Sequence, residues 1–201
     1  MKLRSEATAA RADSPQKKFR RRDAFPNLSR FLTAEQHRIH LVGVAGSGMS
    51  GLAGLLIELR HVVSGSDKVT STETERLQRL GLRFHEQHLA EHADAADLVV
   101  FSSAIKDDNP ILLTARSCGK PVFRRAEAVA AIMQAKRGIV IAGMHGKTTT
   151  SAMTAHVLRE GGLHPSHYVG AEIPILGTNA YWNERSEYFV AEGDESDGTL
   201  R

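Results

Sequence analysis

Short apolar runs alternate with segments of helical periodicity along most of the chain. The run over residues 38–44 is typical of a strand buried in a parallel sheet, and leucines at helical spacing predict a helix over residues 49–60. The same patterns predict further strands over residues 61–67, 82–85, 98–105 and 121–123, and further helices over residues 73–80, 111–118 and 126–134. This alternation predicts an α/β fold built on a parallel sheet.

A second strand–helix pattern begins near residue 137, where an apolar strand over residues 137–141 leads into a helix over residues 148–160. Three further segments are a short edge strand over residues 168–170, a loop-rich stretch over 177–187 and a strand over 188–192. No Pro/Gly-rich linker separates the two patterns, so we expect two units that pack together, with the boundary near residues 135–137.

The first 36 residues carry no sustained hydrophobic periodicity, and they include Pro15 and Pro26. Lysines and arginines outnumber acidic residues there and give the segment a charge of +5. Such a composition predicts a basic, disordered tail over residues 1–36.

Composition excludes several classes of protein. The chain has 201 residues, of which 41% are apolar and 24% are charged, as in a soluble globular protein. The net charge is +3, so without the tail the remainder carries −2 and is not a basic nucleic-acid platform. No apolar run is long enough to span a bilayer, and no apolar segment resembles a secretory signal. The lone Cys118 excludes a disulfide framework, so we expect a cytoplasmic protein that binds neither nucleic acid nor membrane.

The first glycine-rich segment lies between a predicted strand and a predicted helix. Gly46, Gly48 and Gly51 form the pattern Gly-x-Gly-x-x-Gly, and Asp67 ends the next strand 21 positions after Gly46. This order is typical of a Rossmann-like βαβ unit whose helix start faces a phosphate or diphosphate. A turn needed only for close helix–strand packing is the alternative. Ser102 lies toward the C-terminal end of the strand predicted over residues 98–105, where open α/β sheets place ligands.

The second glycine-rich segment, Gly143-Met-His-Gly-Lys-Thr-Thr149, follows the strand over residues 137–141. Its glycines would aim backbone N–H groups at a phosphate, Lys147 would supply a mobile positive charge, and Thr148 would place a hydroxyl on Mg²⁺. The first glycine is nearer to the lysine than in the common Gly-x-x-x-x-Gly-Lys-Ser/Thr pattern, and an ordinary strand–turn–helix is the alternative. The candidate ATP contacts are Gly143, Met144, His145, Gly146, Lys147, Thr148 and Thr149.

An acidic cluster follows the last predicted strand. Glu192, Asp194, Glu195 and Asp197 lie within six residues. Such carboxylates repel one another unless a cation lies among them, and an acid at a strand end beside a phosphate loop commonly completes a Mg²⁺ site. We expect Glu192 to bind the metal together with Thr148, with Asp194 or Glu195 as substitutes. An exposed acidic turn is the alternative.

These motifs, in this order, resemble those of the Mur ligase family. The resemblance rests on residues 43–51, 64–67, 102–105 with 109–110, 124–127, 142–150 and 191–197. It implies a Rossmann-like domain for a UDP-linked substrate over residues 37–135 and the start of a P-loop ATPase α/β domain over residues 136–201. The segment after Arg137 is short for a complete ATPase domain, so we expect an N-terminal fragment that is inactive alone. Met144 departs from the threonine that is usual in the family.

The resemblance further implies an ATP-dependent ligase that joins L-alanine to UDP-N-acetylmuramate through an acyl phosphate, in peptidoglycan precursor synthesis. It implies that Lys147 and Glu192 are catalytic, and that Mg²⁺ and ATP bind at the second glycine segment. The substrate-binding positions that it implies are Gly46, Ser47, Gly48, Met49, Ser66, Asp67 and Ser102. Three alternatives remain open: a murein tripeptide ligase of the same family, an NAD(P)-dependent oxidoreductase and a non-catalytic UDP-sugar-binding fragment.

Overall fold

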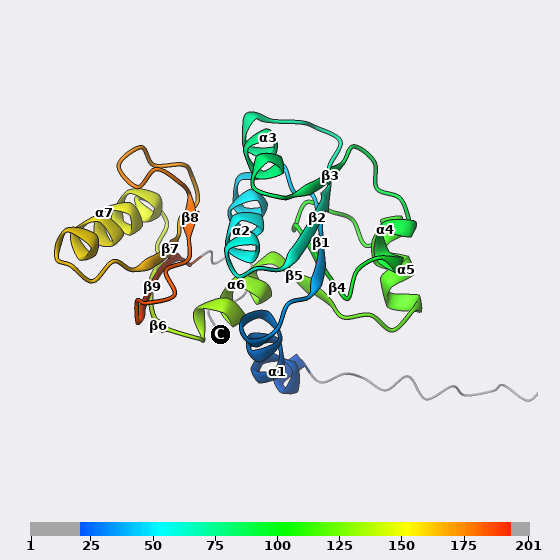
Figure 1. Ribbon diagram of the computed structural model, residues 1–201, viewed down its shortest axis with the longest axis horizontal. Helices are drawn as coiled ribbons and strands as arrows, with labels where there is room; N and C mark the ends of the chain where they lie inside the picture. The colour runs from blue at the N-terminus through cyan, green and yellow to red at the C-terminus, as the bar shows by residue number, and fades with distance from the viewer. Residues whose placement is uncertain (1–20, 194–201) are drawn as a thin grey trace, which may run out of the picture.

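The computed structural model describes residues 21–193, with side chains from Leu28 onward, and it shows two α/β units side by side (Figure 1). The first unit contains a parallel five-stranded sheet in the order β3-β2-β1-β4-β5. Its strands are β1 (Arg38–Val42), β2 (Val62–Ser66), β3 (Arg83–His85), β4 (Leu98–Phe101) and β5 (Val122–Arg124). Its helices after β1 are α2 (Ser47–Glu58), α3 (Thr72–Arg79), α4 (Glu91–Asp94), α5 (Pro110–Ser117) and α6 (Arg125–Met133).

The strand order creates a switch point between β1 and β4. The chain runs outward from β1 to β2 and β3, and then returns to place β4 on the other side of β1. At such a point the loops that leave the carboxyl ends of the two strands diverge and open a crevice. The first glycine segment follows β1 and Ser102 follows β4, so both predicted ligand-binding segments lie at this crevice.

The second unit contains four strands in the order β6-β9-β7-β8. They are β6 (Arg137–Ile141), β7 (Ser166–Tyr168), β8 (Ala180–Tyr181) and β9 (Tyr188–Glu192), and helix α7 (Lys147–Glu160) covers one face of the sheet. β6, β9 and β7 are parallel, whereas β8 pairs with β7 in the antiparallel sense. The predicted α/β class with a parallel sheet is therefore confirmed.

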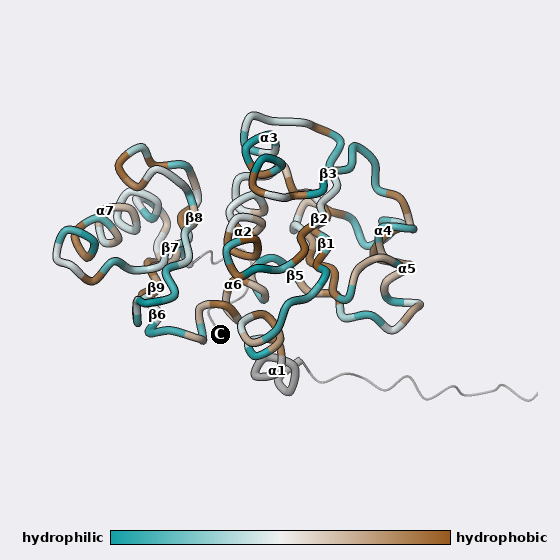
Figure 2. Tube along the Cα trace, in the orientation of Figure 1, coloured by the Kyte–Doolittle hydropathy of each residue, from teal (hydrophilic) through white to brown (hydrophobic). Residues whose placement is uncertain are grey.

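Helix α2 joins the two units. Its residues from Met49 to Leu56 are all buried, which one helix face packed on one sheet cannot explain. Figure 1 shows the reason, because α2 lies between the sheet of the first unit and strand β8 of the second. Tyr168, Ala180 and Phe189 of the second unit belong to the same hydrophobic cluster as the leucines of α2. Figure 2 shows hydrophobic segments gathered along β1 and β2 at the centre of the first sheet.

Helix α1 (Arg21–Ala34) overturns part of the predicted tail. Leu28 and Leu32 are only 2% and 1% exposed and pack in the core beside α6, and His61 lies 2.9 Å from the Leu32 carbonyl through Nε2. The prediction of disorder is wrong here because three apolar side chains, Leu28, Phe31 and Leu32, suffice to form a buried stripe. Residues 1–20 lie outside the described part of the chain.

Several predicted boundaries also change. The strand expected over residues 98–105 ends at Phe101, because the chain then turns and the N–H of Ile105 donates to the Ser102 carbonyl at 3.0 Å. The edge strand expected over residues 168–170 is β7, which begins two residues earlier and lies inside the sheet between β9 and β8, so the expected edge position is wrong. β8 lies in the stretch expected to be loop. Among residues 21–193, no helix is both long and apolar enough to cross a membrane.

Four histidines, one of which is His92 of α4, form a cluster at one side of β1. His40 on β1 is fully buried, with Nδ1 2.9 Å from the Ser64 hydroxyl and Nε2 3.1 Å from the Ser66 hydroxyl. The rings of His85 and His92 stack at 4.0 Å, and the Ser66 hydroxyl also lies 2.8 Å from His88 Nδ1. Burial, aided by repulsion from His92, His85 and His88, lowers the pKa of His40 to about 3.

Two glycine substitutions test the packing of the first unit. Gly65→Ala should lower the free energy of unfolding by about 1–3 kcal/mol, because the new methyl would lie 2.8 Å from Cβ of Val44. Gly54→Ala, whose new methyl would have its nearest neighbour at 3.9 Å, should raise it by about 0.5–1 kcal/mol through helix propensity. Urea unfolding measures both, and a shift of the same sign in the two variants would contradict this packing.

The histidine cluster predicts acid sensitivity. His40 stays neutral in the folded chain down to a pKa of about 3 but accepts a proton near pH 6.5 when unfolded. The stability that depends on neutral His40 is therefore present above about pH 6.5 and is lost as the pH falls, by up to about 1.4 kcal/mol per pH unit. In urea unfolding between about pH 7 and pH 5, His40→Gln should show a shallower loss than the parent chain. Equal slopes would refute the assignment.

Candidate nucleotide site between two glycine loops

One cavity of about 310 Å³ brings together the predicted residues of the first glycine loop with Ser102, Lys147 and Glu192, whereas residues 143–146, Thr148 and Thr149 do not line it. It lies between the first glycine loop, the end of β4, the start of α7 and the end of β9. Its lining consists of Gly46, Ser47, Gly48, Met49, Ser102, Ser103, Arg125, Lys147, Tyr168, Gly170 and Glu192. The first glycine loop and Lys147, which lies about 100 residues later in the sequence, thus border the same space.

The first loop presents the start of helix α2 to the cavity. Gly43 allows the sharp turn after β1, with φ of +86°, and Gly46 is the N-terminal cap of α2 without a side-chain hydrogen bond. The first turn of α2 contains no acidic residue, and Gly46, Ser47, Gly48 and Met49 line the cavity at this helix start. This geometry suits an anionic ligand.

Two predicted substrate contacts have other partners. The Asp67 carboxylate accepts from the N–H of Ala45 at 2.9 Å and from the N–H of Lys68 at 2.7 Å, so it fixes the first loop to the end of β2. Ser66 is fully buried, and its hydroxyl faces His40 and His88. Neither residue lines the cavity between the two loops.

The second loop turns sharply between β6 and α7. Gly143 and Gly146 have φ of +140° and +76°, values that L-residues with side chains rarely adopt. Lys147 begins α7, and its Nζ donates to the Gly143 carbonyl at 2.7 Å across the loop. Thr148 is half-buried in the first helical turn and Thr149 is exposed. Met144 is 83% exposed and His145 is exposed, so both side chains point away from packed structure.

Glu192 ends β9 beside the strand that leads into the second loop. β9 pairs with β6, and Glu192 is opposite Ile141. Its Oε1 accepts from the N–H of Gly170 at 2.8 Å, which fixes the carboxylate at the cavity. The predicted alternatives Asp194 and Glu195 lie outside the described residues.

The donor set is compatible with Mg²⁺. Over residues 21–193 no group of three or more His, Cys, Asp or Glu side chains could hold a metal ion by itself. Magnesium commonly binds through one or two protein oxygens, with water and substrate phosphates completing the octahedron. The Glu192 carboxylate and the Thr148 hydroxyl are oxygen donors of the kind that Mg²⁺ takes, but of these two predicted ligands only Glu192 lines the cavity.

Arg125 and Tyr168 are cavity residues that the sequence analysis did not assign. Arg125 begins α6 and its Nη1 donates to the Tyr168 hydroxyl at 2.9 Å, and that hydroxyl donates to the Gly48 carbonyl at 2.7 Å. Arg125 lies within residues 124–127, one of the segments that resemble the Mur ligase family. Its position directly after strand β5 could have indicated a ligand-facing residue. Tyr168 carried no comparable signal, because its role depends on the packing of the second unit against α2.

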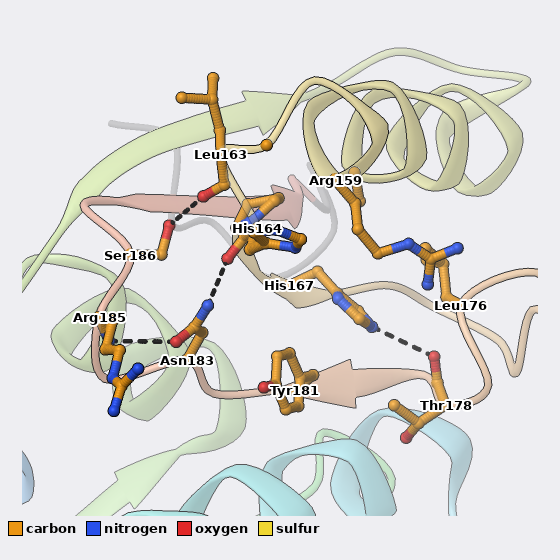
Figure 3. Close-up of a pocket in the computed structure, with 13 residues that line it drawn as sticks. Arg159, Leu163, His164, His167, Leu176, Thr178, Tyr181, Asn183, Arg185 and Ser186 are labelled. Atoms are coloured by element: carbon orange, nitrogen blue, oxygen red, sulfur yellow. Dashed lines mark hydrogen bonds between the residues drawn. The ribbon is translucent and has the colours of Figure 1, made fainter.

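A larger cavity of about 740 Å³ lies in the second unit alone, between the end of α7, β7 and β8 (Figure 3). It contains none of the predicted site residues. Its walls are tied by hydrogen bonds from the Asn183 amide to the His164 carbonyl at 2.7 Å and from the Ser186 hydroxyl to the Leu163 carbonyl at 2.9 Å. Since Lys147 lies at the other end of α7, this cavity is separate from the phosphate loop.

The fold is that of an α/β protein in which two glycine loops each lead from a parallel strand into a helix. Comparison with known proteins makes the class specific. The model of the Mur ligase family, catalytic domain, matches residues 38–137. The UDP-N-acetylmuramate–L-alanine ligase of Syntrophobacter fumaroxidans is 50% identical over 166 residues, which are 82% of this chain and 35% of that protein. The ligase of the same name from Geotalea daltonii is 48% identical over 81% of this chain and 35% of its own length.

Solved structures agree. The UDP-N-acetylmuramate-alanine ligase MurC of Thermotoga maritima matches with a TM-score of 0.74 and 31% identity, over 80% of this chain and 38% of that one. The UDP-N-acetylmuramate:L-alanyl-γ-D-glutamyl-meso-diaminopimelate ligase of Neisseria meningitides matches with a TM-score of 0.74 and 29% identity, over 81% and 54%. The chain belongs to the Mur ligase family. It spans about a third of the length of the curated relatives that it matches.

Proposed function

We propose that this chain holds UDP-N-acetylmuramate on its first glycine loop and ATP with Mg²⁺ on its second. In this proposal it supplies these two sites to a ligase that joins L-alanine to the muramate carboxylate. The observation that carries the proposal is the single cavity lined by the first glycine loop, by Lys147 of the second glycine segment and by Glu192. The names of the curated relatives support the choice of substrates.

The reaction requires alignment and charge neutralisation. A carboxylate oxygen of UDP-N-acetylmuramate attacks the γ-phosphorus of ATP, the bond to the β–γ bridging oxygen breaks, and ADP leaves. The amine of L-alanine then attacks the acyl carbon, loses a proton and expels phosphate. The starts of α2 and α7 would hold the diphosphate and the triphosphate, and Lys147 would stabilise charge on the transferred phosphoryl group. Thr148 and Glu192 would hold Mg²⁺, which supplies further neutralisation when bound.

The alternatives explain less. An NAD(P)-dependent oxidoreductase would use the first loop but would leave the second loop and its convergence on the same cavity without a role. A murein tripeptide ligase has the same fold, yet the curated relatives at about 50% identity are L-alanine ligases. A chain that binds the UDP-sugar without turnover is compatible with the span of about a third of the relatives. We propose that the isolated chain binds both ligands, and its inactivity alone stays a prediction.

Calorimetric titration of the isolated chain tests the assignment of the two ligands. UDP-N-acetylmuramate and ATP with Mg²⁺ should each bind, and NAD⁺ should not. Lys147→Ala should weaken ATP binding about tenfold or more, since a charge-assisted contact contributes about 1.5–3 kcal/mol. Lys106→Ala, an exposed lysine outside the cavity lining, is the matched control and should leave the ATP affinity unchanged. Binding of NAD⁺ in place of UDP-N-acetylmuramate would contradict the proposal.

Glu192→Gln tests the metal site. The amide can still accept the hydrogen bond from Gly170, so the fold should persist, but the charge that attracts Mg²⁺ is removed. We expect ATP binding to lose most of its dependence on Mg²⁺ concentration. Glu187→Gln is the control, because Glu187 is exposed and lies 3.9 Å from Arg137 at the opposite end of β9. An unchanged Mg²⁺ dependence in Glu192→Gln would remove Glu192 from the metal site.

A further inference from the structure

The first glycine loop is held by residues of the second unit. The Tyr168 hydroxyl of β7 donates to the Gly48 carbonyl at 2.7 Å, and the Asn179 amide donates to the Ser47 carbonyl at 2.9 Å. Tyr168 is only 3% exposed. The start of α2, where the diphosphate is proposed to bind, is thus fixed by side chains from the unit that carries the ATP loop.

Tyr168 is also tied to Glu192. In the register of β7 and β9, Tyr168 is opposite Ala191, the residue before Glu192. Two residues after Tyr168, the N–H of Gly170 donates to Glu192 Oε1 at 2.8 Å. A displacement of Tyr168 relative to the cavity therefore moves the donor that fixes the Glu192 carboxylate.

The contacts leave little free space to absorb a movement. A methyl group at Gly48 would lie 2.6 Å from Nη1 of Arg125 and 3.0 Å from the Tyr168 hydroxyl, and one at Gly170 would lie 2.7 Å from Oε2 of Glu192. Packed elements transmit small shifts instead of dissipating them. The guanidinium of Arg125 places a positive charge beside Tyr168. Its Nη1 donates to the Tyr168 hydroxyl at 2.9 Å, and its side chain lines the cavity.

We infer that Arg125 and Tyr168 are positioning residues that couple the two ligand sites. This inference rests on the proposed function. A diphosphate at the start of α2 draws the guanidinium of Arg125 toward it, since Arg binds phosphate through two parallel N–H donors. The Tyr168 hydroxyl, which accepts from Arg125, then adjusts with it, and β7 carries the change to Gly170 and Glu192. Binding of the UDP-sugar thereby prepares the carboxylate that the ATP-bound metal requires.

The test is the ratio of two ATP affinities, measured calorimetrically with Mg²⁺ in the absence and in the presence of saturating UDP-N-acetylmuramate. In the parent chain the second affinity should be tighter by about fivefold or more, and ATP should tighten UDP-N-acetylmuramate by the same factor. In Tyr168→Phe the ratio should fall to one. A merely structural role would change both affinities and leave their ratio intact.

Tyr181→Phe is the matched control, because Tyr181 lies on the neighbouring strand β8, is 42% exposed and does not line the cavity between the loops. Its ratio should equal that of the parent chain. Arg125→Lys is the second variant, which keeps the charge on a half-buried side chain but removes the planar fork, and its ratio should also fall toward one. If Tyr168→Phe does not fold, the ratio measured for Arg125→Lys tests the coupling in its place.

The outcomes separate the two claims. If both ligands bind the parent chain with a ratio of one, or if the two variants keep the parent ratio, the coupling is overturned and the proposed function stands. If the parent chain fails to bind either ligand, the proposed function is overturned together with the coupling.

Discussion

The packing of strand β7 against the start of helix α2 determines which residues of the two units meet at the cavity. Each glycine loop is formed by the strand before it and the helix after it. These local elements do not determine which other residues lie opposite the loop. The hydrogen bond from Tyr168 to the Gly48 carbonyl and the burial of α2 between two sheets fix that relation. Because of it, the N-terminus of α2, Lys147 and Glu192 line one cavity of about 310 Å³.

The parts of the fold that depend on local pattern could be predicted from the sequence. Apolar strands, helical spacing and glycine turns predicted the α/β class. Glycines at suitable spacing, with lysine and threonine in the second loop, predicted the position of both glycine loops. Ser102 was predicted from its place at a strand end in an open sheet, and it lines the cavity. These inferences needed no knowledge of which segments meet in space.

The parts that depend on distant packing could not be predicted. Leu28 and Leu32 lie in a charged segment, and only contact with α6 shows that they are core residues. Tyr168 has no motif, and it became a site residue through contact with Gly48, 120 positions away. Asp67 and Ser66 were assigned to the ligand from their place at a strand end. In the structure, however, Asp67 holds a loop and Ser66 packs with histidines.

The central claim is that one cavity holds both ligands, and proximity between the ligands tests it most directly. Mn²⁺ in place of Mg²⁺ would bring a paramagnetic centre to the ATP site, and the ³¹P relaxation of bound UDP-N-acetylmuramate would then be measured. The account predicts strong enhancement of relaxation for the diphosphate when ATP and Mn²⁺ are both bound, with loss of the enhancement in Glu192→Gln. Binding of both ligands with no enhancement would place them in separate sites and contradict the account.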